Sequence, residues 1–470
     1  HLATPAKKAG VRAAAKPSRS TTAAAAKRPV KVTAPAGRPR ATQARRQPGS
    51  TFKTIVYLTA LEAGWEPDDT IPNTPITQGS YRPKNSREQY SPQITLEDAF
   101  AQSSKKILVV GDSAGGTLSF VDESTLTRLG YVNAIPDVKE RLAEMDIIRR
   151  ATYEVAKATK GGDRFVDDIA VSLDGKTVFI SRSNLSDVIA IDLSSPDHRI
   201  LWRFPIPGIN ADHMGISPDG KHIAVSATSD GHFFVIDTAT GKQVAKVPTG
   251  AFPHQNDYSP DGKYIYNSSL GIIPLPYALN ALKGRKQMTV VDAQTFKVVN
   301  KWTLPYGIRP NVITRDGKIT YLQMSYLNGY AKVDMATGKV LNKVEIPMSA
   351  YAKANFKTKD DFPLNSAFHG MAINGAESKL CMAGTIDNYI VVASVPSMTT
   401  DRIIPSGSKP YWASTSSDGK RCYVSNSESN DLSVVDFESA TEVARIKVGQ
   451  YPQRSRLANV PPAILDNLKH

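Results

Sequence analysis

Pro218-Asp219-Gly220-Lys221 is one of five copies of a short turn sequence that decides the fold of this 470-residue chain. Asp-Gly supplies the positive φ that a tight β-hairpin turn requires, and a run of β-branched or alternating apolar residues follows each copy. Each turn therefore predicts a pair of antiparallel strands. The other copies are Leu173-Asp174-Gly175-Lys176, Pro260-Asp261-Gly262-Lys263, Arg315-Asp316-Gly317-Lys318 and Ser417-Asp418-Gly419-Lys420.

A second repeated element is an apolar strand that ends in Asp, as in Val235-Ile236-Asp237 and Val434-Val435-Asp436. Most copies continue into a turn such as Thr240-Gly241-Lys242, so we expect the Asp carboxylate to accept hydrogen bonds from backbone N–H groups of the turn. The two elements recur about every forty residues, which is the length of a four-stranded propeller blade. Complete copies predict blades at 164–208, 209–250, 251–307, 308–347, 365–407 and 408–449.

A partial copy at 106–135 lacks its innermost strand, and the C-terminal stretch 451–460 has the character to supply it. Pairing the end of the chain with the first blade closes the ring and removes the exposed sheet edges. The sequence thus predicts an all-β fold, a seven-bladed β-propeller with C-terminal strand closure over 106–461. The pattern resembles the YVTN family of seven-bladed, WD40-like propellers, and this resemblance implies a fold rather than an activity.

Residues 46–104 have a different character. Over 48–64 the pattern predicts a turn and then a helix, with Ser50 at its N-terminus and Lys53 three positions later on the same face. There the amine can take the hydroxyl proton, and the helix dipole favours negative charge on the attacking oxygen. Together with Tyr81-Arg82-Pro83-Lys84-Asn85 and 94–104, this stretch resembles the transpeptidase domain of class A penicillin-binding proteins.

The resemblance implies that Ser50 is the acylated serine, Lys53 its general base and Ser103 the serine of the S-x-N motif. Two departures predict an inactive, truncated segment. Lys105 stands where the family has Asn, and no Lys-Thr-Gly or Lys-Ser-Gly follows. The strands that would build the oxyanion hole are therefore missing. A peptidoglycan transpeptidase with Ser50 as its nucleophile is accordingly the third of three function classes.

Positive charge is concentrated at the start of the chain. The first 49 residues hold twelve Lys and Arg and no acidic residue, so the other 421 residues carry only +2 of the net charge of +14. Because this stretch has few large apolar residues, we expect 1–45 to be a disordered basic tail. A solvated linker and contact with an anionic envelope polymer, lipid headgroups or nucleic acid are the alternatives. Aromatic residues do not interleave its charges, which argues against specific nucleic-acid binding.

The remaining segments are a transpeptidase-like segment at 46–105, the propeller at 106–461 and a C-terminal tail at 462–470. No apolar run of about eighteen residues occurs, so no membrane span is predicted. The chain begins at His1 rather than Met, which suggests that an upstream signal or anchor is missing.

Two insertions interrupt the blade period, namely a Pro-containing loop at 272–286 and a helical stretch at 137–159 with Val138, Leu142, Met145 and Ile148 on one side. Such insertions either wall a binding site or pack on the surface.

Cys381 and Cys422 occupy matching places in neighbouring repeats. We expect propeller geometry to hold them too far apart to bond, which makes them buried free thiols. His198 falls in a turn and is expected to be solvated. His222 and His232 lie on strands that face neighbouring blades, and we give them no role.

The inner strand of each blade begins near the central channel, so residues about five positions before each Asp-Gly turn are expected to converge there. The predicted ring comprises Asp167, Asp168, Asp212, His213, His254, Gln255, Arg309, Asn311, His369, Tyr411, Trp412 and Arg454.

Three interpretations of this ring stay open. Neutral imidazoles of His213, His254 and His369 bind a divalent transition metal. Alternatively, one histidine is the base and Tyr411 the acid in β-elimination from a uronic-acid sugar, with Arg309 or Arg454 pairing the carboxylate. Finally, the histidines are hydrogen-bonded structural residues around a solvent-filled channel.

The preferred interpretation is a monomeric, secreted or periplasmic propeller that binds a ligand without catalysis. Its expected partner is a carbohydrate or another cell-envelope polymer, and a divalent metal ion is the one cofactor considered. A propeller-based polysaccharide lyase acting on uronic-acid glycans is the second class.

Overall fold

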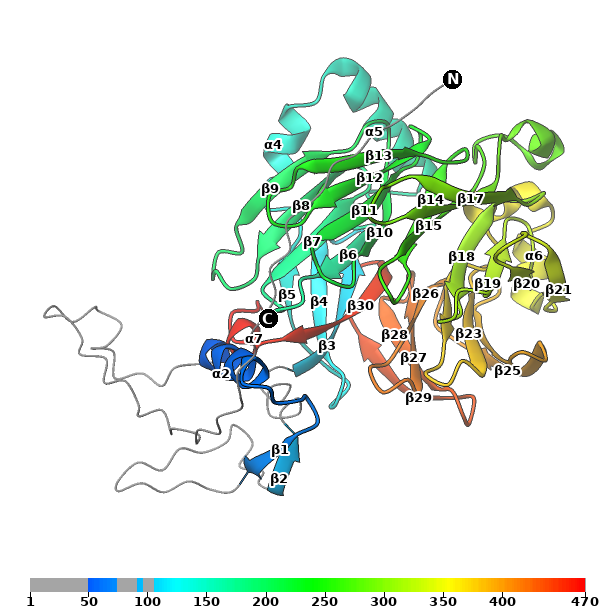
Figure 1. Cartoon of the computed structure of the whole chain (residues 1–470). Helices are drawn as coiled ribbons and strands as arrows, with labels where there is room; N and C mark the ends of the chain where they lie inside the picture. Colours follow the sequence, from blue (N-terminus) through cyan, green and yellow to red (C-terminus); the bar gives the residue numbers. More distant parts are fainter. Residues whose placement is uncertain (1–49, 74–90, 96–104, 470) are drawn as a thin grey trace, which may run out of the picture. The chain divides into compact units, whose positions relative to one another are not determined.

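The computed structural model describes residues 50–73, 91–95 and 105–469 (Figure 1). Residues 105–460 contain seven four-stranded antiparallel sheets, one for each blade. Blade 1 consists of β30 (Pro452–Val460), β3 (Lys105–Asp112), β4 (Thr117–Asp122) and β5 (Thr127–Asn133). Blade 2 consists of β6 (Asp168–Val171), β7 (Thr177–Arg182), β8 (Asp187–Asp192) and β9 (Ile200–Pro205). Blade 3 consists of β10 (Ala211–Ile216), β11 (His222–Ala227), β12 (His232–Asp237) and β13 (Gln243–Pro248).

The other four blades have the same order. Blade 4 consists of β14 (Pro253–Tyr258), β15 (Tyr264–Ser269), β16 (Gln287–Asp292) and β17 (Val298–Thr303). Blade 5 consists of β18 (Ile308–Ile313), β19 (Ile319–Met324), β20 (Gly329–Asp334) and β21 (Val340–Glu345). Blade 6 consists of β22 (Met371–Ile373), β23 (Lys379–Gly384), β24 (Tyr389–Ser394) and β25 (Thr399–Pro405). Blade 7 consists of β26 (Pro410–Thr415), β27 (Arg421–Asn426), β28 (Asp431–Asp436) and β29 (Thr441–Lys447).

The first strands of consecutive blades contact one another all the way round. β6 contacts β10, and β10 contacts β14. The contacts continue in the same way through β18, β22, β26 and β30, and β30 contacts β6. The ring closes because β30, from the C-terminus, pairs with β3, as the red and cyan strands of Figure 1 show. In this pairing Lys105 lies opposite Val460 and Leu108 opposite Leu457. The predicted seven-bladed propeller with C-terminal strand closure is confirmed.

The Asp-Gly turns fold as their sequence predicts. In blade 3 Gly220 has a φ of +71°, a region that costs glycine little. The carboxylate of Asp219 accepts from the Ser217 hydroxyl at 2.6 Å and from the Lys221 N–H at 3.1 Å. The strand-ending aspartates act in the same way, since Asp237 accepts from the Thr240 N–H at 2.8 Å. Their role is turn chemistry, as expected.

Apolar residues between the blades form the core. The second and third strands of most blades are buried almost throughout, while outer strands such as β13 and β17 are mostly exposed. The final segment also contributes to this core. Ile464, in α7 (Pro462–Leu465), and Leu468 pack with the buried residues of blades 1 and 2, and Lys469 pairs with Tyr131 of β5.

Our expectations for the two cysteines and for His198 were wrong. Cys381 of β23 and Cys422 of β27 form a disulfide, with Cα atoms 6.4 Å apart, because these strands of neighbouring blades face each other across one apolar cluster. His198 is only 4% exposed, although it stands in a turn. Propeller geometry therefore brings matching positions of neighbouring blades closer than we expected.

Three insertions lie between strands. The first contains α4 (Val138–Ala143) and α5 (Ile147–Thr159), the second η1 (Tyr277–Leu282), and the third α6 (Ala350–Asn355), η2 (Lys359–Asp361) and η3 (Pro363–Asn365). Val138, Leu142 and Met145 pack on one small cluster, as predicted. Ile148 does not join them and is 79% exposed.

The described part of the N-terminal segment comprises α2 (Ser50–Glu62) and a two-stranded sheet of β1 (Thr70–Asn73) and β2 (Ser91–Thr95). α2 begins at Ser50, and Gly64 follows its end with a φ of +88°. The basic tail, the Tyr81–Asn85 motif and Ser103 lie outside the described residues. Among the helices that the structure describes, none has the length and apolar character needed to cross a bilayer.

Candidate functional site

The predicted ring residues lie at the channel end of the inner strands. Asp168 begins β6, and Asp212 and His213 lie in β10, His254 and Gln255 in β14, Arg309 and Asn311 in β18, Tyr411 and Trp412 in β26, and Arg454 in β30. Asp167 directly precedes β6, and His369 precedes β22 by two residues. All of them are buried. Each blade therefore contributes at least one polar side chain to the channel.

The structure brings the three ring histidines together. The His213 and His254 ring centroids are 4.0 Å apart, and the His369 ring lies 5.5 Å from His254 and 6.1 Å from His213. One nitrogen of each ring lies within 4.8 Å of the other two. Two further rings enclose the cluster, since Tyr411 stacks on His369 at 4.1 Å and Trp412 lies 5.3 Å from His213.

All three imidazoles are neutral at ordinary pH. Burial lowers the pKa of His213, His254 and His369 well below the usual value, and the positive charge of Arg454 adds to the effect in each case. The Tyr411 carbonyl oxygen lies 3.0 Å from His369 Nδ1 and can only accept, so Nδ1 carries the proton and Nε2 keeps its lone pair.

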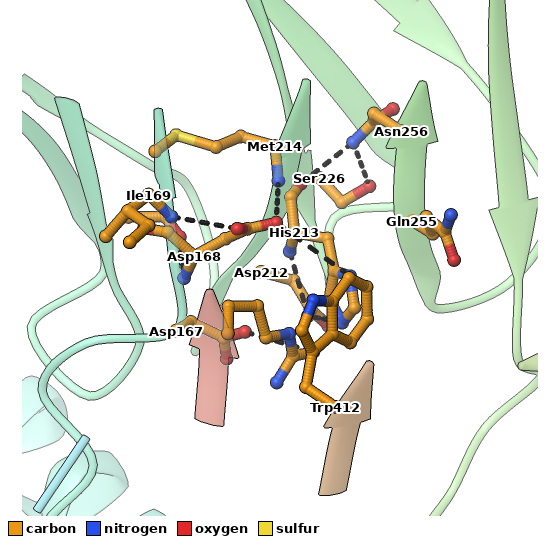
Figure 2. A network of polar contacts seen from close by, with 12 residues as sticks. Asp167, Asp168, Ile169, Asp212, His213, Met214, Ser226, Gln255, Asn256 and Trp412 are labelled. Carbon is orange, nitrogen blue, oxygen red and sulfur yellow. Dashed lines mark hydrogen bonds and ion pairs between the residues drawn. The ribbon is translucent and has the colours of Figure 1, made fainter. Parts of the chain in front are cut away.

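A ring of polar contacts between blades fixes His213 (Figure 2). The Asp168 carboxylate accepts from the Met214 N–H of β10 at 3.2 Å and from Arg456 of β30 at 2.7 Å. The Asn256 amide donates to the His213 carbonyl oxygen at 2.9 Å. These bonds hold the backbone of His213 from both sides, while its imidazole makes no hydrogen bond to any described residue.

Two arginines of the ring differ in how their charge is balanced. Arg454 Nη2 lies 3.3 Å from Asp167 Oδ1. Burial alone would lower the pKa of Arg454, but Asp167, together with Tyr411, Asp168 and Asp212, raises it overall. Arg309 is 1% exposed and donates to Ser325 Oγ at 3.1 Å and to the Leu364 carbonyl oxygen. Within the described part of the chain no carboxylate lies at ion-pair distance from Arg309, and burial lowers its pKa to about 10.

The buried side chains of Asp212 and Lys160 both have hydrogen-bond partners within the protein. Asp212 accepts from Thr228 Oγ1 at 2.9 Å, and burial, with the Asp167 charge second, raises the pKa of Asp212 to about 7. Lys160 donates to Asn210 Oδ1 at 2.8 Å, and burial lowers its pKa. A deprotonated Asp212 and a charged Lys160 thus both carry a desolvation cost.

A cavity of 930 Å³ adjoins these ring residues. Ring residues including His254, His369, Arg309, Tyr411 and Arg454 line it and are called its floor, whereas His213 is not among the lining residues. Its walls come from all three insertions, with α5 prominent: Ile147, Ile148 and Val155 are 88%, 79% and 67% exposed and line the cavity. The other apolar wall residues include Ile209, Phe252, Ile273, Pro274 and Leu364.

Sequence reasoning missed several of these residues. The third insertion, which contributes Pro363 and Leu364, was signalled only by the unassigned gap at 348–364 between two predicted blades. Lys160 and Gln453 also line the cavity, and nothing in the local sequence marks them. Ser50 and Lys53 lie in the first turn of α2, but their side chains are outside the described part of the structure, so their predicted roles stay untested.

The fold is a seven-bladed β-propeller, and residues at the start of several of its inner strands line a cavity. The N-terminal part is similar to another class of protein, since the family model of the penicillin binding protein transpeptidase domain matches residues 6–122. The last strands in this match, β3 and β4, belong to blade 1. The resemblance predicted for the N-terminal segment is confirmed.

Curated relatives match the same region. Penicillin-binding protein 1A of Rickettsia typhi is 43% identical over 100 residues, which cover 20% of this chain and 12% of that protein. Penicillin-binding protein 1A of Neisseria lactamica is 44% identical over 77 residues, covering 15% of this chain and 10% of the relative. The chain thus spans about an eighth or less of the length of these relatives. Among solved structures, Kuenenia stuttgartiensis hydrazine synthase has a TM-score of 0.39 and 17% identity, covering 58% of this chain and 95% of that chain.

Proposed function

We propose that the propeller is a binding module for a small molecule that carries a carboxylate and an apolar body, and that this molecule occupies the channel-mouth cavity. The observation that carries this proposal is Arg309, a buried guanidinium on the cavity floor without a carboxylate partner among the described residues. Arginine stays protonated in proteins, so its burial is costly until an anion pairs with it. A ligand carboxylate would supply that partner in bidentate geometry.

The walls favour an apolar body for the ligand. Ile147, Ile148 and Val155 expose apolar surface into the cavity, and burying such surface is worth about 25 cal/mol per Å². The volume of 930 Å³ falls in the range of small-molecule sites and is modest for a polymer. A single-headed amphiphile fits both the charged floor and the apolar walls.

Octanoate and octan-1-ol test this proposal because they share the apolar chain and differ in charge. By isothermal titration calorimetry we expect octanoate to bind about tenfold or more tightly than octan-1-ol, since a hydrogen-bonded ion pair contributes about 1.5–3 kcal/mol. Arg309→Met should abolish this preference. Arg315→Met, on an exposed turn of the same blade, is the matched control and should preserve it.

Equal binding of the two probes to the unmutated chain would contradict the proposal, as would unchanged octanoate binding by Arg309→Met. Circular dichroism should first establish that both variants fold. Loss of the Arg309 side chain leaves Ser325 Oγ and the Leu364 carbonyl oxygen unpaired, so a modest change in stability is expected and does not bear on the result.

A second candidate function is β-elimination from a uronic-acid glycan, favoured by the stacked His369 and Tyr411 rings beside Arg309. In this reaction a neutral imidazole would take the proton next to the carboxylate, the glycosidic C–O bond would break, and the Tyr411 hydroxyl would protonate the leaving oxygen. Burial raises the pKa of Tyr411 and so keeps that proton in place. Ultraviolet absorbance of unsaturated product from polygalacturonate, lost in Tyr411→Phe, would support this activity, and its absence in the unmutated chain would exclude this substrate.

We also propose that the chain works outside the cytoplasm, in the periplasm or as a secreted protein of the cell envelope. The Cys381–Cys422 disulfide supports this, because such bonds form and persist in oxidising compartments. The monomeric state and a carbohydrate partner stay predictions.

A further inference from the structure

We propose that His213, His254 and His369 bind one transition-metal ion of the zinc class at the base of the channel-mouth cavity. The three residues come from blades 3, 4 and 6, so no local sequence motif unites them. Their ligand nitrogens lie within 4.8 Å of one another. Zinc holds histidine nitrogens at about 2.0–2.1 Å, which places the nitrogens about 3.4 Å from each other in tetrahedral geometry. The three rings must therefore move closer together to complete the site.

Unpaired nitrogen atoms are the strongest sign that something is bound here. Both ring nitrogens of His213 and Nδ1 of His254 are buried and have no hydrogen-bond partner in the described part of the chain. The nearest carboxylate oxygens to His213 are Asp212 Oδ1 at 3.7 Å and Asp168 Oδ2 at 4.0 Å, which is too far for a hydrogen bond. Leaving a buried polar atom unpaired costs about 1–3 kcal/mol. A metal ion bound to one nitrogen of each ring would remove that cost for the ligating atoms.

His369 has the arrangement of a metal ligand with a supporting contact. Its Nδ1–H donates to the Tyr411 carbonyl oxygen at 3.0 Å, which fixes the ring and leaves Nε2 as the nitrogen with a lone pair. Metal-bound histidines almost always donate their other N–H to a carbonyl or carboxylate in this manner.

The charges around the cluster are mixed. The guanidiniums of Arg309, Arg454 and Arg456 disfavour a dication, and the carboxyl groups of Asp167, Asp168 and Asp212 offset them to the extent that they are ionised. A second possible ligand set, Asp167, Asp212 and His213, shares one residue with the first. Its carboxylates already pair with Arg454 and Thr228, which favours the three-histidine set.

Three protein ligands leave a coordination position free. His254 and His369 line the cavity and His213 does not, so we expect that position to face the cavity. Three nitrogen donors and an open position are typical of zinc sites that bind a water molecule or an oxygen ligand. The metal site does not depend on the proposed carboxylate ligand, although such a ligand would have both Arg309 and the metal within the same cavity.

Metal titration of the full chain tests the proposal. After treatment with a chelator and dialysis, we expect Zn²⁺ to bind at one equivalent per chain and to raise the melting temperature. Co²⁺ should give intense visible bands, which indicate four-coordination. His254→Gln and His369→Gln should weaken binding by about 100-fold or more, and His198→Gln, which changes a buried histidine elsewhere, should leave it unchanged.

Several results would overturn the proposal. These are the absence of stoichiometric Zn²⁺ binding, weak octahedral Co²⁺ bands, and unchanged binding in both His254→Gln and His369→Gln. Loss of binding in Asp167→Asn with retention in His369→Gln would assign the metal to the acidic set instead. If a variant does not fold, the Co²⁺ spectrum of the unmutated chain decides alone. Octanoate binding is scored separately with the metal-free chain, so either proposal can fail without the other.

Discussion

Breaking the Cys381–Cys422 disulfide should destabilise the propeller strongly. The bond joins β23 of blade 6 to β27 of blade 7, and both cysteines are fully buried. The chain contains no other cysteine, so reduction changes this one bond alone. Whatever stability the bond provides can therefore be measured without a competing thiol.

The size of the effect follows from the length of chain that the bond closes. The two cysteines are 41 residues apart, and the entropy of closing such a loop in the unfolded chain corresponds to about 4 kcal/mol at 25 °C. Strain in the folded state and structure in the unfolded state both reduce this figure, so an observed loss of about 2–4 kcal/mol is expected.

Guanidinium denaturation followed by tryptophan fluorescence measures the loss, with oxidised and reduced samples compared. The Cys381→Ala, Cys422→Ala double variant is the control, because reductant should have no effect on it. Alkylation of the oxidised, denatured chain followed by mass spectrometry should find no free thiol. Two alkylated cysteines, or oxidised and reduced chains that differ by less than about 1 kcal/mol, would refute the reasoning.

Three further predictions concern other parts of the chain. Burial raises the pKa of Asp112 from 3.8 to about 7, so between these pH values the folded state holds a proton that the unfolded state releases. The free energy of unfolding should therefore fall by up to about 4 kcal/mol as pH rises from 4 to 7. Thermal melts of Asp112→Asn should show a weaker dependence on pH. Deleting the chain from Tyr451 onward removes β30 and exposes the edge of β3, so we expect lost cooperativity and aggregation by size-exclusion chromatography; an unchanged melting temperature would contradict the role of closure. Because Lys105 replaces the expected Asn, we expect that fluorescent penicillin does not label the chain. If the unmutated chain is labelled and Ser50→Ala is not, the serine is active and this prediction is wrong.

Much of the candidate site was predictable because propeller geometry is regular. The position of each Asp-Gly turn fixes where its inner strand begins, and this placed His213, His254 and Arg309 in the channel from three separate repeats. The apolar walls were not predictable to the same degree. The pattern 137–159 indicated helix correctly, yet whether Ile148 faces a neighbouring cluster or the cavity depends on how α5 lies against blades 2 and 3.

The sequence by itself determined the repeat, the seven blades and the closing role of the C-terminal strand, because hairpin turns and strand periodicity are local properties of the chain. Only the tertiary structure decided which side chains of different blades meet: the disulfide between Cys381 and Cys422, the burial of His198, and the separation of the three histidine rings. These contacts depend on the twist and packing of whole sheets around the ring, and interactions within one blade do not fix them.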